Sequence, residues 1–253
     1  MNLLSVSDDH NAGDRAVTIN DLNLTYITTV EKKPTFRQAL TRTGRKTREV
    51  RALQGINLEI PYGSVLGVIG SNGAGKSSLM KILTGYYKEW EGEISYDGLD
   101  LKIDLQNIQK KVGYLPENNP LYTDMYVREY LEFVGRIYKI KNLKARVSEM
   151  ISAVGLDVEQ HKKIGALSKG YRQRVGLAQA IIHDPEVLIL DEPTTGLDPN
   201  QLVEIRELIR SIGKEKTVLL STHIMQEVEA ICDRVIIISK GQIVADDKAQ
   251  TLQ

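Results

Sequence analysis

The segment SVLGVIGSNGAGKSSLMKILTGYY, residues 64–87, constrains the fold of this chain more than any other part of the sequence. Its first residues are almost all apolar, which is typical of a strand buried on both faces of a sheet. Its last residues show a helical pattern, and GSNGAGKSS lies between the two. This arrangement, G-x-x-x-x-G-K-S between a buried strand and a helix, predicts a loop that binds phosphate groups.

The residues of this loop suit that chemistry. Gly70, Gly73 and Gly75 let backbone amides curl around phosphate oxygens where a Cβ atom would clash. Lys76 supplies a positive charge for the β- and γ-phosphates of a nucleotide, and the Ser77 hydroxyl can bind Mg²⁺. We therefore expect nucleotide contacts from Gly70, Ser71, Asn72, Gly73, Ala74, Gly75, Lys76, Ser77 and Ser78.

Buried strands and helices alternate along the rest of the chain. Apolar runs within 185–193, 217–223 and 233–247 predict further strands, the last as a pair around a Lys-Gly turn, and 116–183 is mostly helical in pattern. This alternation predicts an α/β fold with a parallel sheet. Residues 16–26 and 52–60 alternate apolar with polar residues, which predicts an antiparallel β flank.

These patterns also suggest a domain organisation. We expect residues 1–15 to be a flexible tail and residues 16–253 to form one domain. Its core would comprise residues 16–115 and 184–253, with an inserted helical subdomain at 116–183.

Composition excludes several other classes of protein. Lys and Arg together number 33, as do Asp and Glu, so no global charge drives the chain onto nucleic acid or a membrane. No apolar run approaches the length of a membrane span. The single cysteine, Cys232, is expected to be a small buried hydrophobe in a reducing compartment. We expect a cytoplasmic protein whose membrane contact is peripheral.

Three charged or titratable residues follow buried strands. Asp191 ends one strand beside the predicted loop, which is the expected position of a carboxylate that supports Mg²⁺. Glu192 comes next and could act as the general base that activates a water molecule. His223 follows another strand, where it could contact the γ-phosphate and orient that water.

Four motifs in order carry a resemblance to a known family. The phosphate loop, LSKGYRQR at 167–174, LILDEPTTGLDP at 188–199 and STH at 221–223 have the order and rough spacing of the ATP-binding cassette (ABC) ATPases. The resemblance covers about residues 16–245. It implies a P-loop NTPase core, bound ATP and Mg²⁺, and hydrolysis of ATP to ADP and phosphate.

The resemblance also implies a partner chain. In this family two nucleotide-binding domains pair head to tail, and each ATP lies between the phosphate loop of one and the signature motif of the other. Ser168 and Gly170, in the signature motif, would contact the ATP of a second ATPase chain, and Asp198 would be the acidic residue of the D-loop. One loop and one signature per chain imply a homodimer or a pair with a close relative.

The sequence departs from the family pattern at three places. Lys169 and Tyr171 replace the usual residues of L-S-G-G-Q, and Glu117 replaces the glutamine expected after GYLP. A carboxylate at residue 117 can still ligate Mg²⁺ or orient water. Tyr26 fits the family's adenine-stacking aromatic, although a strand-packing role is the alternative.

GYLPENNPLY at 113–122 is similar to the ATPases of bacterial multidrug, antibiotic and gliding-motility exporters. The resemblance therefore implies an exporter ATPase on the inner face of the membrane that drives a separate transmembrane permease and does not bind nucleic acid. The main alternative is a soluble ABC ATPase that acts on nucleic acid or ribosomes, and a third is a regulatory module that binds ATP without turnover.

A basic insertion is predicted at residues 28–51. It contains a short amphipathic pattern, PTFRQAL, comparable to an element of polysaccharide and teichoic-acid exporter ATPases. Its cations could contact anionic lipid, and a solvated surface loop is the equal alternative. The cations are Lys32, Lys33, Arg37, Arg42, Arg45, Lys46, Arg48 and Arg51.

Overall fold

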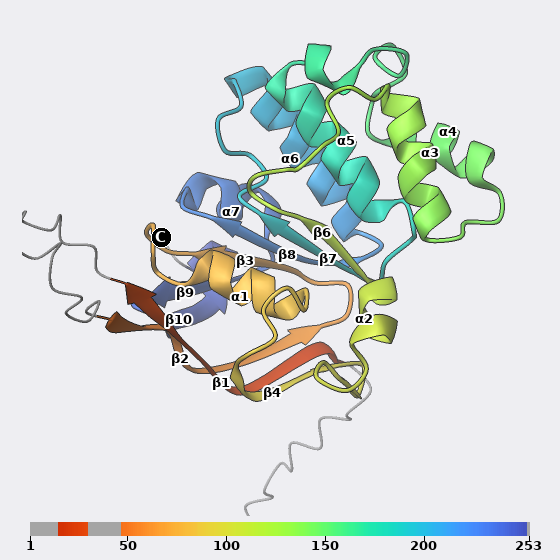
Figure 1. The fold of residues 1–253 in the computed structure, drawn as a ribbon. Helices are drawn as coiled ribbons and strands as arrows, with labels where there is room; N and C mark the ends of the chain where they lie inside the picture. The colour runs from red at the N-terminus through yellow and green to blue at the C-terminus, as the bar shows by residue number, and fades with distance from the viewer. Residues whose placement is uncertain (1–14, 30–46, 252–253) are drawn as a thin grey trace, which may run out of the picture.

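The computed structural model describes residues 15–29 and 47–251 (Figure 1). Four strands form an antiparallel sheet in the order β2-β1-β4-β5. Their bounds are β1 Arg15–Thr29, β2 Thr47–Pro61, β4 Glu91–Tyr96 and β5 Leu99–Asp100. This sheet is the predicted antiparallel flank.

The second sheet has the order β10-β9-β3-β8-β7-β6, and its strands are parallel except for the antiparallel pair β9 and β10. Its strands are β3 Val65–Ile69, β6 Val112–Leu115, β7 Val187–Asp191, β8 Thr217–Thr222, β9 Arg234–Ser239 and β10 Gln242–Lys248. The carboxyl ends of β3, β7 and β8 therefore meet at one edge, which brings residues distant in sequence together.

Helix α1, Lys76–Leu83, lies between the two sheets (Figure 1). Its apolar side chains are fully buried and belong to one hydrophobic cluster with residues of both sheets. Val187 and Ile189 of β7 point into this cluster, whereas Leu188 and Leu190 belong to the cluster on the other face. This alternation covers both faces of β7 and explains its unbroken apolar sequence.

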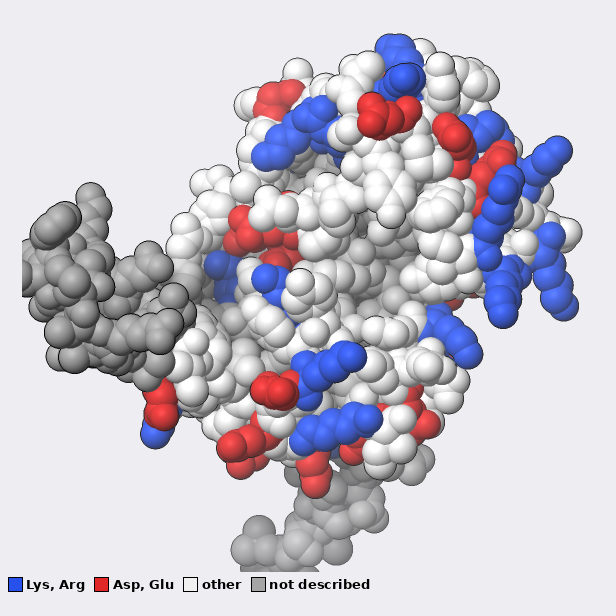
Figure 2. All heavy atoms as spheres, viewed as in Figure 1, with Lys and Arg blue, Asp and Glu red and all other residues white. Residues whose placement is uncertain are grey.

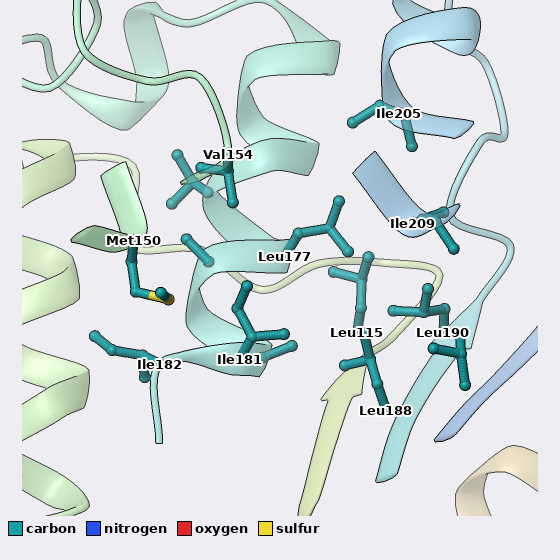
Figure 3. Packing of buried hydrophobic residues seen from close by; sticks show 14 of the residues in the cluster. Leu115, Met150, Val154, Leu177, Ile181, Ile182, Leu188, Leu190, Ile205 and Ile209 are labelled. Atoms are coloured by element: carbon teal, nitrogen blue, oxygen red, sulfur yellow. The ribbon is translucent and has the colours of Figure 1, made fainter. Parts of the chain in front are cut away.

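The remaining helices are α2 Leu105–Lys111, α3 Val127–Ile137, α4 Leu143–Ala153, α5 Lys169–Ile181, α6 Pro199–Gly213 and α7 Met225–Ile231, with 3₁₀ turns at Ile164–Ala166 and Ala249–Thr251. Figure 3 shows Leu177 and Ile181 of α5 close to Leu115, Leu188 and Leu190 of the sheet. One hydrophobic cluster thus continues from the sheet through α5 to α3 and α4. The helical segment is packed on the sheet as part of the same core.

The sequence pattern placed the end of the first strand too early and the beginning of the second strand too late. β1 continues past Tyr26 to Thr29, and β2 begins at Thr47, because the two strands keep pairing beyond the residues that alternate between apolar and polar. Parts of the predicted insertion at 28–51 are therefore strand. Its remainder, 30–46, and residues 1–14 of the predicted tail lie outside the described residues.

Cys232 is buried, as predicted, and its thiol lies against the backbone of Gly67 in β3. Burial raises the pKa of this thiol to about 12. In the part of the chain that the structure describes, we find no helix with both the length and the apolar character required to cross a membrane.

On the face shown in Figure 2, acidic and basic side chains are interspersed. This distribution agrees with the equal totals of positive and negative residues in the sequence.

Candidate functional site

The predicted phosphate loop joins β3 to α1 and depends on its glycines. Gly73 and Gly75 have φ values of 79° and 117°, which side chains disfavour. A Cβ on Gly75 would lie 2.6 Å from the carbonyl oxygen of Ala52, and one on Gly70 would lie 2.4 Å from that of Ile238. No larger residue fits at these two positions without a backbone shift.

The turn between β9 and β10 supports this loop from behind. Gly241 N donates to the carbonyl oxygen of Ala74 at 2.8 Å, and Gln54 N donates to that of Gly241 at 2.8 Å. These bonds tie the loop to strands of both sheets. The Lys-Gly turn predicted from the sequence therefore has a second role as a support of the loop.

Lys76 is buried within the loop that it follows. Its side chain is only 6% exposed, and its Nζ donates to the carbonyl oxygen of Gly70 at 2.8 Å. The same Nζ lies 3.3 Å from Oε1 of Glu192. The predicted phosphate-binding cation and the predicted base are therefore an ion pair.

Ser77 and Asp191 form the centre of the predicted metal site. Ser77 Oγ donates to Asp191 Oδ1 at 3.1 Å, and Ser221 Oγ donates to the same oxygen at 2.6 Å. Glu117 is exposed and lines the same pocket. Hydroxyl and carboxylate oxygens are the ligands that Mg²⁺ prefers, so this donor set fits that ion.

These oxygens do not enclose a metal by themselves. Among residues 15–29 and 47–251, no group of three or more His, Cys, Asp or Glu side chains is arranged to hold a metal ion. Mg²⁺ commonly binds one or two carboxylates together with phosphate oxygens of a substrate. The arrangement therefore suits a metal that arrives with a nucleotide.

Glu192 has the most constrained geometry in the site. Its φ is 51°, an unusual value for a residue with a side chain, and such backbone strain costs about 1–3 kcal/mol and concentrates at functional sites. Its backbone N–H donates to Oγ of Ser221 at 3.0 Å, which holds the strained turn. The carboxylate is 8% exposed, so it is poorly hydrated yet accessible from the pocket.

Two side chains orient that carboxylate. His223 Nδ1 lies 2.9 Å from Oε2 of Glu192, and Thr195 Oγ1 donates to the same oxygen at 3.0 Å. Because a carboxylate only accepts, the proton of a neutral His223 lies on Nδ1 and leaves Nε2 as an acceptor. His223 is about half exposed, with a side-chain exposure of 47%, so it is accessible from the pocket it lines.

A pocket of about 500 Å³ lies over the loop and collects most of the predicted residues. From the predicted set, the pocket is lined by Tyr26, Ser71, Asn72, Gly73, Gly75, Lys76, Ser77, Ser78, Glu117, Glu192 and His223. Tyr26 is 44% exposed at this pocket, so its ring is available to a ligand. Gly70, Ala74 and Asp191 do not line this pocket. They take part in the backbone contacts and hydrogen bonds described above.

Ser168, Gly170 and Asp198 do not line this pocket. Ser168 is the N-cap of α5 and accepts from Tyr171 N at 3.3 Å, while Asp198 is the N-cap of α6 and accepts from Gln201 N at 3.0 Å. Gln201 Nε2 also donates to Ser168 Oγ at 3.3 Å. The three residues thus form a second group, exposed at Ser168 and Asp198 and joined through Gln201.

The structure adds functional residues that sequence reasoning missed. Ser221 bridges Asp191 and Glu192, and Thr195 contacts the Glu192 carboxylate. Lys240 and Arg51 add positive charge to the pocket wall. Ser221 is the first residue of the quoted STH motif, and Thr195 lies three residues after Glu192 in LILDEPTTGLDP, so their place in these motifs was the available signal.

Comparison with known proteins assigns the chain to a family. The family model described as ABC transporter matches residues 53–195. The chain belongs to the ABC transporter family. Membership confirms the predicted α/β fold, ATP binding and ATP hydrolase activity.

Relatives and solved structures agree with this assignment. The chain is 36% identical to the ABC transporter ATP-binding protein NatA of Bacillus subtilis over 203 residues, which is 79% of this chain and 82% of that protein. It is 36% identical to the bacitracin transport ATP-binding protein BcrA of Bacillus licheniformis over 198 residues, 78% of this chain and 64% of that protein.

Two solved structures have the same fold. CbiO1 from Clostridium perfringens, described as part of the ABC transporter complex CbiONQ, is 27% identical with a TM-score of 0.76, and the match covers 94% of this chain and 90% of that one. The ATP-binding cassette MJ0796, in a dimeric post-hydrolysis state with ADP and phosphate, is 23% identical with a TM-score of 0.77, covering 92% and 98%.

Proposed function

We propose that this ABC ATPase subunit powers export through a separate membrane-embedded permease, and that it works as a head-to-tail dimer of two ATPase chains. The observation that carries the proposal is the contact set of Glu192, whose carboxylate meets Lys76 and His223 over the pocket. A buried base next to a phosphate-binding cation is what hydrolysis of a nucleotide requires.

Lys76 and Glu192 would change partners when ATP enters. The phosphate oxygens offer Lys76 Nζ a competing anion, which would release Glu192 Oε1 from its 3.3 Å contact. Glu192 would then take a proton from a water molecule as that water attacks the γ-phosphorus, and the bond from this phosphorus to the bridging oxygen of ADP would break, which releases ADP and phosphate. His223, held at Oε2, would keep the carboxylate oriented during this step.

Ser77, Asp191 and Glu117 would hold Mg²⁺ together with the phosphate oxygens of the nucleotide. The ion would neutralise charge on the β- and γ-phosphates. Ser221 holds Asp191 Oδ1 in place for this role. Glu117 would ligate the ion or orient water.

Ser168 and Gly170 would serve the ATP of the second chain. They do not line the pocket of their own chain, and Ser168 begins α5, whose N-terminus is a favourable site for a phosphate anion. ATP held between two chains would stabilise only the closed pair, and its hydrolysis would loosen it. The dimeric arrangement of MJ0796 supports this proposal.

The names of two relatives support the proposed permease partner. BcrA is a bacitracin transport protein, and CbiO1 is part of a transporter complex. These names favour a transporter over an ABC ATPase that acts on nucleic acid or ribosomes. They also favour a partner that spans the membrane and carries the cargo.

The test of the proposed chemistry is Glu192→Gln, which keeps the size of the side chain and removes the base. ATP turnover should fall by about a hundred- to ten-thousand-fold, the usual contribution of a general base. ATP should still bind, because the phosphate loop is untouched. The matched control is Glu229→Gln on the exposed side of α7, which should keep wild-type turnover. Near-normal turnover by Glu192→Gln would show that another group is the base.

A further inference from the structure

Glu227 on α7 is a buried carboxylate that the proposed mechanism does not use. Its exposed fraction is 1%, the same as that of Asp191, but the proposed phosphate chemistry gives it no role. Its helix begins just after His223, at Met225. Burial of a carboxylate is costly unless hydrogen bonds compensate, so its contacts indicate why it is there.

Oε2 of Glu227 accepts two short hydrogen bonds. Thr194 Oγ1 donates at 2.6 Å, and Thr222 Oγ1 donates at 2.6 Å. Thr222 Oγ1 also accepts from Ile224 N at 3.1 Å, which fixes the direction of its hydroxyl proton toward Glu227. Both threonines are buried, with exposures of 4% and 0%.

These threonines belong to the two segments that carry the catalytic pair. Thr194 is two residues after Glu192, and Thr222 directly precedes His223. The segments are therefore joined twice, once at the pocket by the Glu192–His223 contact at 2.9 Å and once behind it through Glu227. Two contacts fix the orientation of the two segments relative to each other, whereas a single contact would leave them free to rotate about it.

The second carboxylate oxygen connects this arrangement to α6. Oε1 of Glu227 accepts no hydrogen bond from the described residues and lies 3.9 Å from Nη2 of Arg206 on that helix. Arg206 Nε likewise has no hydrogen-bond partner among them. Glu227 therefore lies close to α6, the helix that follows the segment 192–198, as well as to Thr194 within that segment.

We infer that Glu227 is a positioning residue for ATP hydrolysis, which holds Glu192 and His223 in register through Thr194 and Thr222. The inference rests on the proposed roles of Glu192 and His223. It assigns to Glu227 no contact with ATP or metal. Loss of the link should affect the chemical step and leave nucleotide binding at the phosphate loop nearly unchanged.

The test compares the turnover number and the ATP dissociation constant of wild type, Glu227→Ala, Glu227→Gln and Thr194→Val. Glu227→Ala should lower turnover by about ten- to a hundredfold, the cost of a displacement of about an ångström in a catalytic group. Glu227→Gln should restore most of it, because its amide oxygen can accept from both threonines. Thr194→Val removes one of the two hydrogen bonds to Glu227, so its turnover number should lie between those of Glu227→Ala and Glu227→Gln. The ATP dissociation constant of each variant should differ from that of wild type by less than about threefold, because neither Glu227 nor Thr194 contacts the phosphate loop.

A control separates positioning from loss of a buried carboxylate in general. Glu159 is 8% exposed and pairs with Lys162 in the helical segment, where it touches none of these residues. Glu159→Ala should lose stability without loss of turnover per folded molecule, with the folded fraction measured by thermal unfolding. Equal turnover for Glu227→Ala and wild type, corrected in this way, would overturn the inference.

A second background tests whether Glu227 acts through Glu192. In Glu192→Gln, the further change Glu227→Ala should reduce the residual turnover by less than about threefold, because residues that act as a unit are not additive. A full additional loss would contradict positioning of Glu192. Absence of ATP turnover in wild type would instead contradict the proposed function, so the two failures are distinguishable.

Discussion

At the scale of single residues, the site is assembled around Glu192, whose carboxylate contacts Lys76, His223 and Thr195. The apolar run before Asp191 and Glu192 placed both carboxylates at the end of a buried strand, and the structure has them there. The sequence could not reveal that Ser221 would bond to both, because that contact depends on the register of β7 against β8. Tertiary pairing decides such contacts, and a linear pattern does not contain it.

Glu117 is a pocket residue that stands where the family pattern has glutamine. It is exposed and lines the pocket with Glu192. If residue 117 reaches the metal or the water, Glu117→Gln should keep much of the turnover, because its oxygen still ligates. Glu117→Ala should lose more, by about tenfold, a typical cost for removal of one polar contact to the transition state. Steady-state ATPase assays at saturating Mg²⁺ check this order.

Equal rates for wild type, Glu117→Gln and Glu117→Ala would contradict a role for this carboxylate in hydrolysis. Tyr122→Phe is a suitable control in the same stretch, because Tyr122 is exposed and outside the pocket. Its turnover should match that of wild type.

At the scale of elements, the buried strands were the most predictable part of the fold. β3, β7, β8 and β9 read as continuous apolar runs because both of their faces are covered. The strands β4 and β5 were not predicted, since EGEISYDGLD carries few apolar residues and owes its structure to the pairing of β4 with β1 and of β5 with β4. The ends of β1 and β2 were missed for the same reason.

The position of α1 between two sheets makes a prediction for stability. Leu79 is fully buried there, so Leu79→Ala should lower the free energy of unfolding by about 2–5 kcal/mol, the range for loss of a buried leucine side chain. Ile103→Ala removes a side chain that is 81% exposed and should change it by less than about 0.5 kcal/mol. Denaturant titrations of the three proteins measure the difference.

A cost for Leu79→Ala as small as that for Ile103→Ala would mean that α1 is not enclosed by both sheets. Since the phosphate loop runs directly into α1, such a finding would also remove the rigid support of the loop.

At the scale of the whole molecule, one chain contains two groups of candidate residues that do not meet in it. Lys76, Glu192 and His223 line the pocket, whereas Ser168, Gly170 and Asp198 are gathered around Gln201 elsewhere. The motifs were all legible in the sequence, and their separation within one chain agrees with what the family resemblance implied. The proposed head-to-tail dimer would unite the two groups twice, once at each ATP, and would give the second group a function.

The most direct test of this account is to mix two inactive chains. Ser168→Arg blocks the signature motif and Lys76→Ala disables the phosphate loop, so each alone should hydrolyse almost no ATP. Random pairing of equal amounts gives heterodimers with one intact composite site, and about a quarter of the wild-type sites should recover. The account predicts that turnover appears on mixing, at protein concentrations where wild-type chains dimerise. A mixture as inactive as either parent under those conditions would contradict it.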